Sequence, residues 1–353
     1  MDLFEQQEQQ EPGRTDAGIA ALAKAAGNER IPAADRDALW ERIHQHMNRP
    51  AKKPFLLLHG WKVAAALLVL LAPLLWLQTA RRPVPAIVRY AASLPDMDAD
   101  TLSATRVLLG KRQGIQVQQQ NAVISYLRGD SLQVNNETLA QNKSADFNTV
   151  LVPYAHTAQI TLPDGSRVWL NAGSKLVYPA SFNSGRREVV LEGEGYFEIA
   201  ANAAHPFQVY AGDAQVRVLG TAFNLSSYKN EKQQLVLCSG SVSVAAGNTE
   251  NLLRPGQLAE LQPDEPVRIT AVNTSRYTAW KEHHLLADHT TLGEILKKLA
   301  RYYNIRIEIS PMAAKETFSG DLDLRNNMEV VLHTIANATS MQCEYANGTV
   351  KIK

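Results

Sequence analysis

The sequence predicts a mainly β protein with a short α-helical head, one transmembrane helix, an all-β domain and a small C-terminal α/β module. Three observations predict this fold class. A single long apolar stretch follows the head, period-two apolar alternation continues to residue 272, and two helix–strand units come after it. The all-β domain is expected to be a sandwich or a short solenoid. A chain of 353 residues is long enough for two or three compact domains.

The composition is that of an ordinary globular protein, with 45% hydrophobic and 20% charged residues and a formal net charge of +1. So small a net charge argues against direct nucleic-acid binding, because no excess of Lys and Arg is available to neutralise phosphates. The two cysteines, Cys238 and Cys343, match no metal or redox spacing. They could form a disulfide in an exported domain, but two separately buried thiols are the favoured interpretation.

The head, residues 1–60, begins with a polar, glutamine-rich stretch over residues 1–13 that is typical of a disordered segment. A weak helix is expected over residues 16–26. A better helix follows within IPAADRDALWERIHQHM, where Asp35 is the expected N-cap. Four apolar residues share one face of this second helix at helical spacing: Leu39, Trp40, Ile43 and Met47.

This apolar stripe has too little surface within so short a head to be buried against its own chain. A partner protein whose groove receives an amphipathic helix is therefore the favoured interpretation. The alternative is a helix that lies on the membrane or packs locally as half of a marginal hairpin. The stripe is the candidate binding site of the head.

The apolar stretch Val63–Ala80 contains 18 residues without a charge and predicts a transmembrane helix over residues 61–80. As a helix it would be about 27 Å long, close to the ~30 Å hydrocarbon core of a bilayer. Trp61 and Trp76 suit the headgroup regions. Pro73 argues against a buried helix of a soluble domain, and the distance from the first residue argues against a cleaved signal peptide.

Charge around the expected span gives only a slight bias in orientation. Four cationic residues precede the span and three follow it, which favours a cytoplasmic N-terminus: Arg49, Lys52, Lys53 and Lys62 against Arg81, Arg82 and Arg89. The large strand-rich body after the span carries no cytoplasmic motif. The expected layout is a cytoplasmic head, one span and an exported body.

The exported body is expected to begin with a linker and leading strands over residues 81–150, and prolines make residues 81–105 typical of a tether. The all-β domain proper is expected over residues 151–272. In AQITLPDGSRVWL a Pro-Asp-Gly turn joins two strands, with Val168 and Leu170 on one face and Trp169 on the other. Glycines and aromatic residues of this domain are interpreted as fold determinants: Gly165, Trp169, Gly193, Gly195, Phe197, Gly220 and Phe223.

The α/β module is expected over residues 280–353. Its first helix, in TTLGEILKKLARYYN, has a capping box from Thr291 to Glu294 and leads into the strand IRIEI. Its second helix, in MEVVLHTIANA, leads into a hairpin whose turn is Asn347-Gly348. This order predicts two successive helix–strand units.

Catalytic chemistry finds little support in the sequence. Glu192, Glu194 and Glu198 lie close together, but no partner cluster accompanies them, so we interpret them as a solvated sheet face. The segment EHHLLADH, residues 282–289, is the densest set of potential metal ligands, and it lacks a zinc spacing. No GxSxG, HExxH or phosphate-binding glycine loop occurs. We therefore expect no enzyme, no cofactor and no metal site.

From about residue 150 onward the chain carries a run of ordered motifs: LPDGSRVWLNAGSKLVYPASF, REVVLEGEGYFEI, HPFQV, VLGTAFNL, SGSVSV and LRPGQ. These motifs resemble the FecR family of transmembrane regulators, in the form that acts as anti-sigma factors in Bacteroidetes. Trp280 and TLGEILKKLARYYNI continue the resemblance into the terminal module, which resembles the secretin/TonB short N-terminal fold.

The resemblance implies an inner-membrane protein with a cytoplasmic N-terminus and a periplasmic C-terminus. Its head would bind an extracytoplasmic-function sigma factor, with Leu39, Trp40, Ile43 and Met47 as the contact. Its periplasmic part would receive a signal from an outer-membrane TonB-dependent transporter, through β-augmentation or a helix contact of residues 290–353. A regulated intramembrane protease would then release the head. The inducing ligand could be an iron chelate or a glycan. The alternative is a single-pass periplasmic receptor or envelope scaffold without sigma binding.

Overall fold

The computed structural model describes residues 84–353 apart from short gaps, together with Asp37, Ala38 and Glu41. The gaps are residues 96–98, 111–112, 128–130, 136, 141–146, 183–184, 247–248, 263–264 and 347–348. The chain divides into two compact units, Met1–Arg82 and Pro83–Lys353. The strands and nearly all described residues belong to the second unit.

In the first unit, Asp37, Ala38 and Glu41 are helical and exposed, and they lie within the second helix expected in the head. The apolar stretch 63–80 lies outside the described residues, as do the stripe residues Leu39, Trp40, Ile43 and Met47, so both features stay predictions. Within the part of the chain that the structure describes, no helix combines the length and the apolar character needed to span a membrane.

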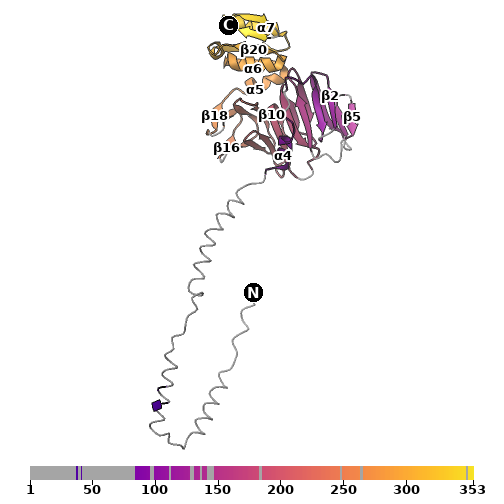
Figure 1. Ribbon diagram of the computed structural model, residues 1–353, viewed down its shortest axis with the longest axis vertical. Helices are drawn as coiled ribbons and strands as arrows, with labels where there is room; N and C mark the ends of the chain where they lie inside the picture. Colours follow the sequence, from indigo (N-terminus) through magenta and orange to yellow (C-terminus); the bar gives the residue numbers. More distant parts are fainter. Residues whose placement is uncertain are drawn as a thin grey trace, which may run out of the picture. The chain divides into compact units, whose positions relative to one another are not determined.

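The second unit begins with the helix α4 (Ala86–Ala92) and continues as a long series of strands, so the mainly β prediction is confirmed (Figure 1). The strands are β1 (Thr105–Leu109), β2 (Gln113–Val117), β3 (Asn121–Leu127), β4 (Ser131–Val134), β5 (Glu137–Ala140), β6 (Phe147–Val152), β7 (Thr157–Thr161), β8 (Arg167–Leu170), β9 (Ser174–Pro179), β10 (Arg187–Glu198), β11 (Phe207–Ala211), β12 (Ala214–Val218), β13 (Ala222–Ser227), β14 (Gln233–Ser239), β15 (Val242–Ala246), β16 (Thr249–Leu253), β17 (Gln257–Leu261) and β18 (Arg268–Ala271).

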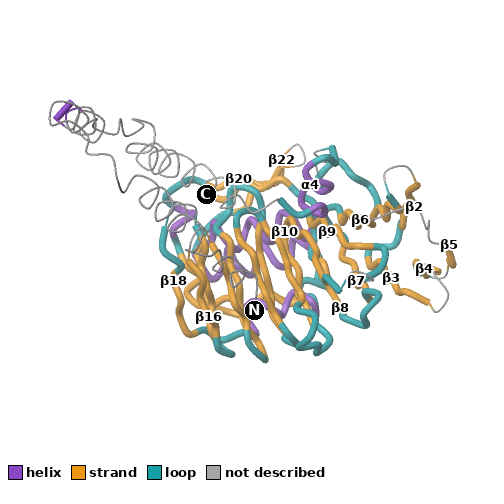
Figure 2. Tube along the Cα trace, turned by 90° about the horizontal axis from the view of Figure 1, so that it is seen from below, coloured by secondary structure: helices purple, strands orange, loops and turns teal. Residues whose placement is uncertain are grey.

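These strands form two sheets that share one strand. Sheet A has the order β2-β1-β6-β9-β10-β11-β12-β15-β16. Sheet B has the order β5-β4-β3-β7-β8-β10-β13-β14-β17-β18. Neighbours are antiparallel except for the parallel pairs β10–β11 and β3–β7. Figure 2 shows β6, β9 and β10 side by side in sheet A. Because β10 belongs to both sheets, the 18 strands form one continuous, curled sheet.

The inward side chains of sheets A and B form one hydrophobic core, so the curled sheet packs as a sandwich. Val168 and Leu170 are fully buried in this core, while Trp169 points to the opposite face and lies outside it. The predicted two faces of strand β8 are therefore confirmed. The rings of Phe197 and Phe223 stack inside the core, with their centroids 4.9 Å apart.

Gly193 is the point at which β10 passes from one sheet to the other. Residues before it pair with β9 in sheet A, and residues from Gly193 onward pair with β13 in sheet B. Its φ of +92° is a conformation that favours glycine, and a Cβ at this position would lie 2.5 Å from the Ser174 Oγ atom. The prediction that Gly193 is a fold determinant has this physical basis.

The outer face of sheet B is not solvated as a whole, because the chain after β18 lies across it. This covering segment contains α5 (Ser275–Thr278) and the 3₁₀ turn η1 (Ala279–Glu282). Tyr196, Val236 and Leu258 are buried although none of them belongs to the sandwich core. Apolar residues on both faces of a sheet indicate that both faces are covered.

The terminal module contains β19 (His284–Thr291), α6 (Leu292–Tyr303), β20 (Arg306–Ile309), η2 (Ala313–Lys315), β21 (Thr317–Asp323), α7 (Met328–Thr339), β22 (Cys343–Ala346) and β23 (Thr349–Ile352). Strands β19 and β21 form one sheet, and β20, β23 and β22 form another. The backbone N–H of Glu294 donates to the Thr291 hydroxyl, which is one of the two hydrogen bonds of the predicted capping box. Both predicted helices and the final hairpin are present, whereas β21 was not predicted.

The helix α4 lies within residues 81–105, for which the sequence predicted a tether. Its Ile87 and Ala91 are buried against Val177 and Val190 of sheet A. This part of the predicted tether is therefore packed on the sandwich, because one face of the short helix is apolar at a spacing of four residues.

Candidate functional site

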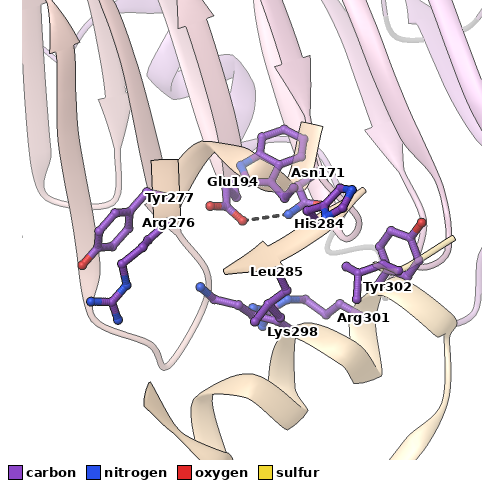
Figure 3. A pocket seen from close by; sticks show the side chains of 11 residues that line it. Asn171, Glu194, Arg276, Tyr277, His284, Leu285, Lys298, Arg301 and Tyr302 are labelled. Carbon is purple, nitrogen blue, oxygen red and sulfur yellow. Dashed lines mark hydrogen bonds between the residues drawn. The ribbon is translucent and has the colours of Figure 1, made fainter. Parts of the chain in front are cut away.

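A buried carboxylate lies at the place where the terminal module meets the outer face of sheet B. Glu194, on β10, is only 7% exposed. Its Oε2 atom accepts a hydrogen bond from Asn171 Nδ2 at 2.8 Å, and its Oε1 atom accepts one from Asn224 Nδ2 at 2.9 Å. Figure 3 shows Glu194 and Asn171 facing each other across this site. The interpretation of Glu194 as part of a solvated face is thus wrong, whereas Glu192 is exposed.

Glu194 fixes the orientation of the Asn224 amide. A carboxylate can only accept hydrogen bonds, so Asn224 must turn its Nδ2 atom toward Glu194. Its Oδ1 atom then faces away and accepts a hydrogen bond from the Trp280 indole Nε1 at 3.1 Å. A chain of hydrogen bonds therefore runs from the sandwich to the covering segment.

A cation–π contact holds the next residue of the covering segment on the same face. The Lys281 Nζ atom lies 3.6 Å from the ring centroid of Tyr196 and 5.3 Å from that of Trp169. Burial raises the pKa of Tyr196 to about 12, so its hydroxyl stays protonated even in alkaline solution. Trp169 was predicted as a fold determinant, and its ring contacts the covering segment as well.

A second set of contacts joins α6 to two turns of the sandwich. The Arg301 guanidinium lies 2.6 Å from the Glu231 carboxylate and stacks over the Tyr228 ring at 3.8 Å. The carbonyl oxygen of Arg301 also accepts a hydrogen bond from the backbone N–H of Ala155 at 2.9 Å. Because the Arg301 side chain is only 11% exposed, removing either charge would leave the other poorly solvated.

A small cavity lies between these two sets of contacts. Its volume is about 30 Å³, enough for one or two water molecules. Side chains of both the sandwich and the module line it, among them Glu194, Lys298 and Tyr302 (Figure 3). The arrangement is suited to holding two domains together, and we call these contacts the joint: Asn171, Glu194, Asn224, Tyr228, Glu231, Trp280, Lys281 and Arg301.

Two family models match this chain over separate ranges. The model of the FecR protein matches residues 148–248, and the model of the FecR C-terminal region matches residues 284–352. Over these two ranges the chain belongs to the FecR family. The FecR region runs from β6 into the β15–β16 hairpin, and the FecR C-terminal region covers nearly the whole terminal module.

Solved structures give the same relationship. Two crystal structures of a protein of Parabacteroides distasonis ATCC 8503, described as a candidate anti-sigma factor, each match with 27% sequence identity and a TM-score of 0.55. Each match covers 58% of this chain and 98% of the chain in the crystal structure. No curated protein matches the chain.

The joint connects the two FecR regions. Glu194, Asn224 and Glu231 belong to the first region and Arg301 to the second, while Trp280 lies in the segment between them. The sequence analysis singled out Trp280, but no sequence pattern indicated that Asn171, Asn224 or Arg301 would contribute to a site. Their importance follows from which strands become neighbours, and that is a property of the fold.

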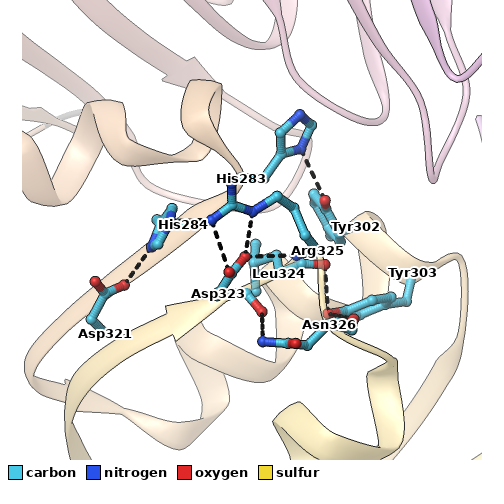
Figure 4. Close-up of polar contacts among 9 residues, drawn as sticks. All are labelled: His283, His284, Tyr302, Tyr303, Asp321, Asp323, Leu324, Arg325 and Asn326. Carbon is cyan, nitrogen blue, oxygen red and sulfur yellow. Dashed lines mark hydrogen bonds and ion pairs between the residues drawn. The ribbon is translucent and has the colours of Figure 1, made fainter.

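Two histidines of the segment 282–289 contact different neighbouring side chains of the same chain (Figure 4). His283 Nδ1 lies 2.9 Å from the Tyr302 hydroxyl, and His284 Nδ1 lies 2.8 Å from Asp321 Oδ1. Arg325 Nη2 lies 3.1 Å from His284 Nε2, and since an arginine can only donate, that nitrogen accepts. Among the residues that the structure describes, no group of three or more His, Cys, Asp or Glu side chains could hold a metal ion.

The two cysteines are free thiols, as the favoured interpretation of the sequence predicted, but each is only partly buried. Burial raises the pKa of each thiol. The structure therefore gives neither cysteine the lowered pKa of a reactive thiolate.

Asp323 is expected to titrate far below an ordinary aspartate, and an Arg325→Gln substitution should reverse this. Hydrogen bonds from the Arg325 side chain and backbone lower the pKa of Asp323 to about 2. Ionised Asp323 therefore favours the folded state above its ordinary pKa, and this contribution is lost as the pH falls toward 2. Carbon-detected NMR titration should show the Asp323 pKa rising toward its ordinary value in Arg325→Gln. A Lys351→Gln variant, which changes an exposed cation on β23, should leave the Asp323 pKa low. Equal titration of Asp323 in all three proteins would contradict the assignment.

Proposed function

We propose that this FecR-family protein regulates a sigma factor from the membrane and relays a signal from outside the cytoplasm to it. The observation that carries the proposal is the match of both its sandwich and its terminal module to FecR regions. The similar protein of Parabacteroides distasonis, described as a candidate anti-sigma factor, supports the same role. The role proposed is that of a regulator, as the two FecR regions and the similar candidate anti-sigma factor suggest.

In this proposal the head binds an extracytoplasmic-function sigma factor through Leu39, Trp40, Ile43 and Met47. Residues 61–80 anchor the chain in the inner membrane, with the head in the cytoplasm and the sandwich and module in the periplasm. The terminal module receives the signal from a TonB-dependent outer-membrane transporter. A regulated intramembrane protease then acts to release the head together with the sigma factor.

The joint gives this relay a physical route within the described residues. A partner that binds the terminal module acts on α6 and the covering segment, which are joined to the sandwich through Arg301 and Trp280. A change in those contacts alters how firmly the module is held. The relay proposal thus rests on contacts that substitutions can break one at a time.

Sigma binding by the apolar stripe is tested with the full-length chain, purified in detergent and mixed with each extracytoplasmic-function sigma factor of the source organism. We expect one of them to co-purify, and we expect Trp40→Glu combined with Ile43→Glu to weaken the complex at least tenfold, because buried carboxylates lose their solvation. In cells the same double variant should raise transcription of the target genes.

The matched control is Glu41→Gln in the same segment, because Glu41 is exposed. It should bind as the unchanged chain does. If no sigma factor of this class binds the unchanged chain, the alternative of a periplasmic receptor or envelope scaffold replaces the proposal.

A further inference from the structure

The helix α4 has few of the features that stabilise a helix by itself. It contains only seven residues, has no side-chain cap at its N-terminus and no acidic residue in its first turn. Isolated helices shorter than about 12–15 residues are marginal in water, and the β-branched Ile87 and Val88 lower the helix propensity further. The helix therefore depends on what it packs against.

Its docking site is an apolar spot on the outer face of sheet A. Val177 of β9 and Val190 of β10 are direct cross-strand partners, and they receive Ile87 and Ala91 of the helix. Ile87 is 1% exposed and Ala91 is 5% exposed, so both are fully covered. The ring of Tyr90 adds a contact to Phe147, with their centroids 5.0 Å apart.

This contact is separate from the core of the sandwich. The cluster formed by Ile87, Ala91, Val177 and Val190 shares no buried residue with the core between the two sheets. Removing the helix would uncover Val177 and Val190, expose more of the partly buried Phe147 and Tyr210 beside them, and leave the core intact. Elements that bury little apolar surface open locally at a lower free energy than the whole domain unfolds.

We infer that α4 is a releasable clasp, which opens by local unfolding while the sandwich stays folded. Docked, its seven residues span about 10 Å as a helix; released, they reach about 24 Å as extended chain. The clasp thereby sets how far the sandwich and the module extend from residue 83. That this reach is measured from the membrane rests on the proposed function, in which residues 61–80 anchor the chain there. The release of α4 itself does not rest on it.

Hydrogen exchange of the full-length chain in detergent micelles tests the clasp. The reporter is the backbone N–H of Ser93, which donates to the carbonyl oxygen of Arg89 at 3.1 Å. We expect Ile87→Ala to accelerate exchange at Ser93 at least tenfold, because it removes the larger side chain that holds the helix down. Val190→Ala, made on the other side of the contact, should accelerate the same amide, while the amides paired between β9 and β10 stay protected.

The control is Arg89→Ala, since Arg89 is an exposed residue of the same helix. It should leave exchange at Ser93 within about twofold of the unchanged chain. Equal acceleration of Ser93 and the β9–β10 amides would overturn the clasp, because α4 would then belong to the cooperative unit of the sandwich. Unchanged exchange in both Ile87→Ala and Val190→Ala would overturn it too. None of these results depends on sigma binding, so failure of the clasp and failure of the proposed function are distinguishable.

Discussion

A Gly193→Ala variant is expected to lose about 3–5 kcal/mol of folding stability. Two costs add at this residue. Its φ of +92° is unfavourable for any residue with a Cβ, and that Cβ would lie 2.5 Å from Ser174 Oγ and 2.7 Å from Ser174 Cα. The second contact involves backbone, so it cannot be relieved by turning a side chain. Denaturant unfolding followed by tryptophan fluorescence measures the loss.

Gly165→Ala separates the two costs. Gly165 has a similar φ of +83°, but nothing lies within 4 Å of the position that a Cβ would take there. This variant should lose only about 1–2 kcal/mol, the cost of the left-handed conformation alone. Equal losses in the two variants would mean that the close approach at Ser174 contributes nothing, and that the bend of β10 can shift to make room.

The predicted parts of the fold are those that depend on local pattern. Period-two alternation placed Val168 and Leu170 in the core, and the capping box placed the start of α6 at Thr291. The strand β21 was not predicted because its sequence, TFSGDLD, buries only Phe318 and Leu322 and contains a central glycine. The docking of α4 was not predicted because three nearby prolines and few apolar residues are equally typical of a tether.

The joint could not be predicted because its residues come together only through long-range pairing. Glu192 and Glu194 have the same parity on β10, and their sequence environments are alike. Their fates differ because β10 changes sheet at Gly193, which leaves Glu192 facing solvent beside Lys175 and Glu194 under the covering segment. No periodicity in a single strand reports what lies across its outer face.

A Glu194→Gln variant is expected to lose about 2–3 kcal/mol of stability, with part of the loss in the attachment of the terminal module. The glutamine would place one N–H₂ group against an asparagine N–H₂ group, so one asparagine amide must turn. Asn171 Oδ1 is held by the backbone N–H of Ala172 at 2.8 Å, whereas Asn224 Oδ1 is held by Trp280 at 3.1 Å. We expect Asn224 to turn, because its bond is the longer one. Trp280 then loses its acceptor.

Glu194 and Trp280 should therefore be coupled although they form no direct hydrogen bond. In a double-mutant cycle, Trp280→Phe should cost about 1 kcal/mol in the unchanged chain and almost nothing in Glu194→Gln. The matched reference is Glu198→Gln, which makes the same chemical change on the same face of β10 at an exposed ion pair with Arg167. The stability losses of Glu198→Gln and Trp280→Phe should be additive.

Hydrogen exchange at the Ala155 amide, which donates to the carbonyl oxygen of Arg301, reports the attachment of the module in every variant. Additive costs for Glu194→Gln and Trp280→Phe would show that Asn171 turns instead, and the carboxylate would then stabilise the sandwich without controlling the joint.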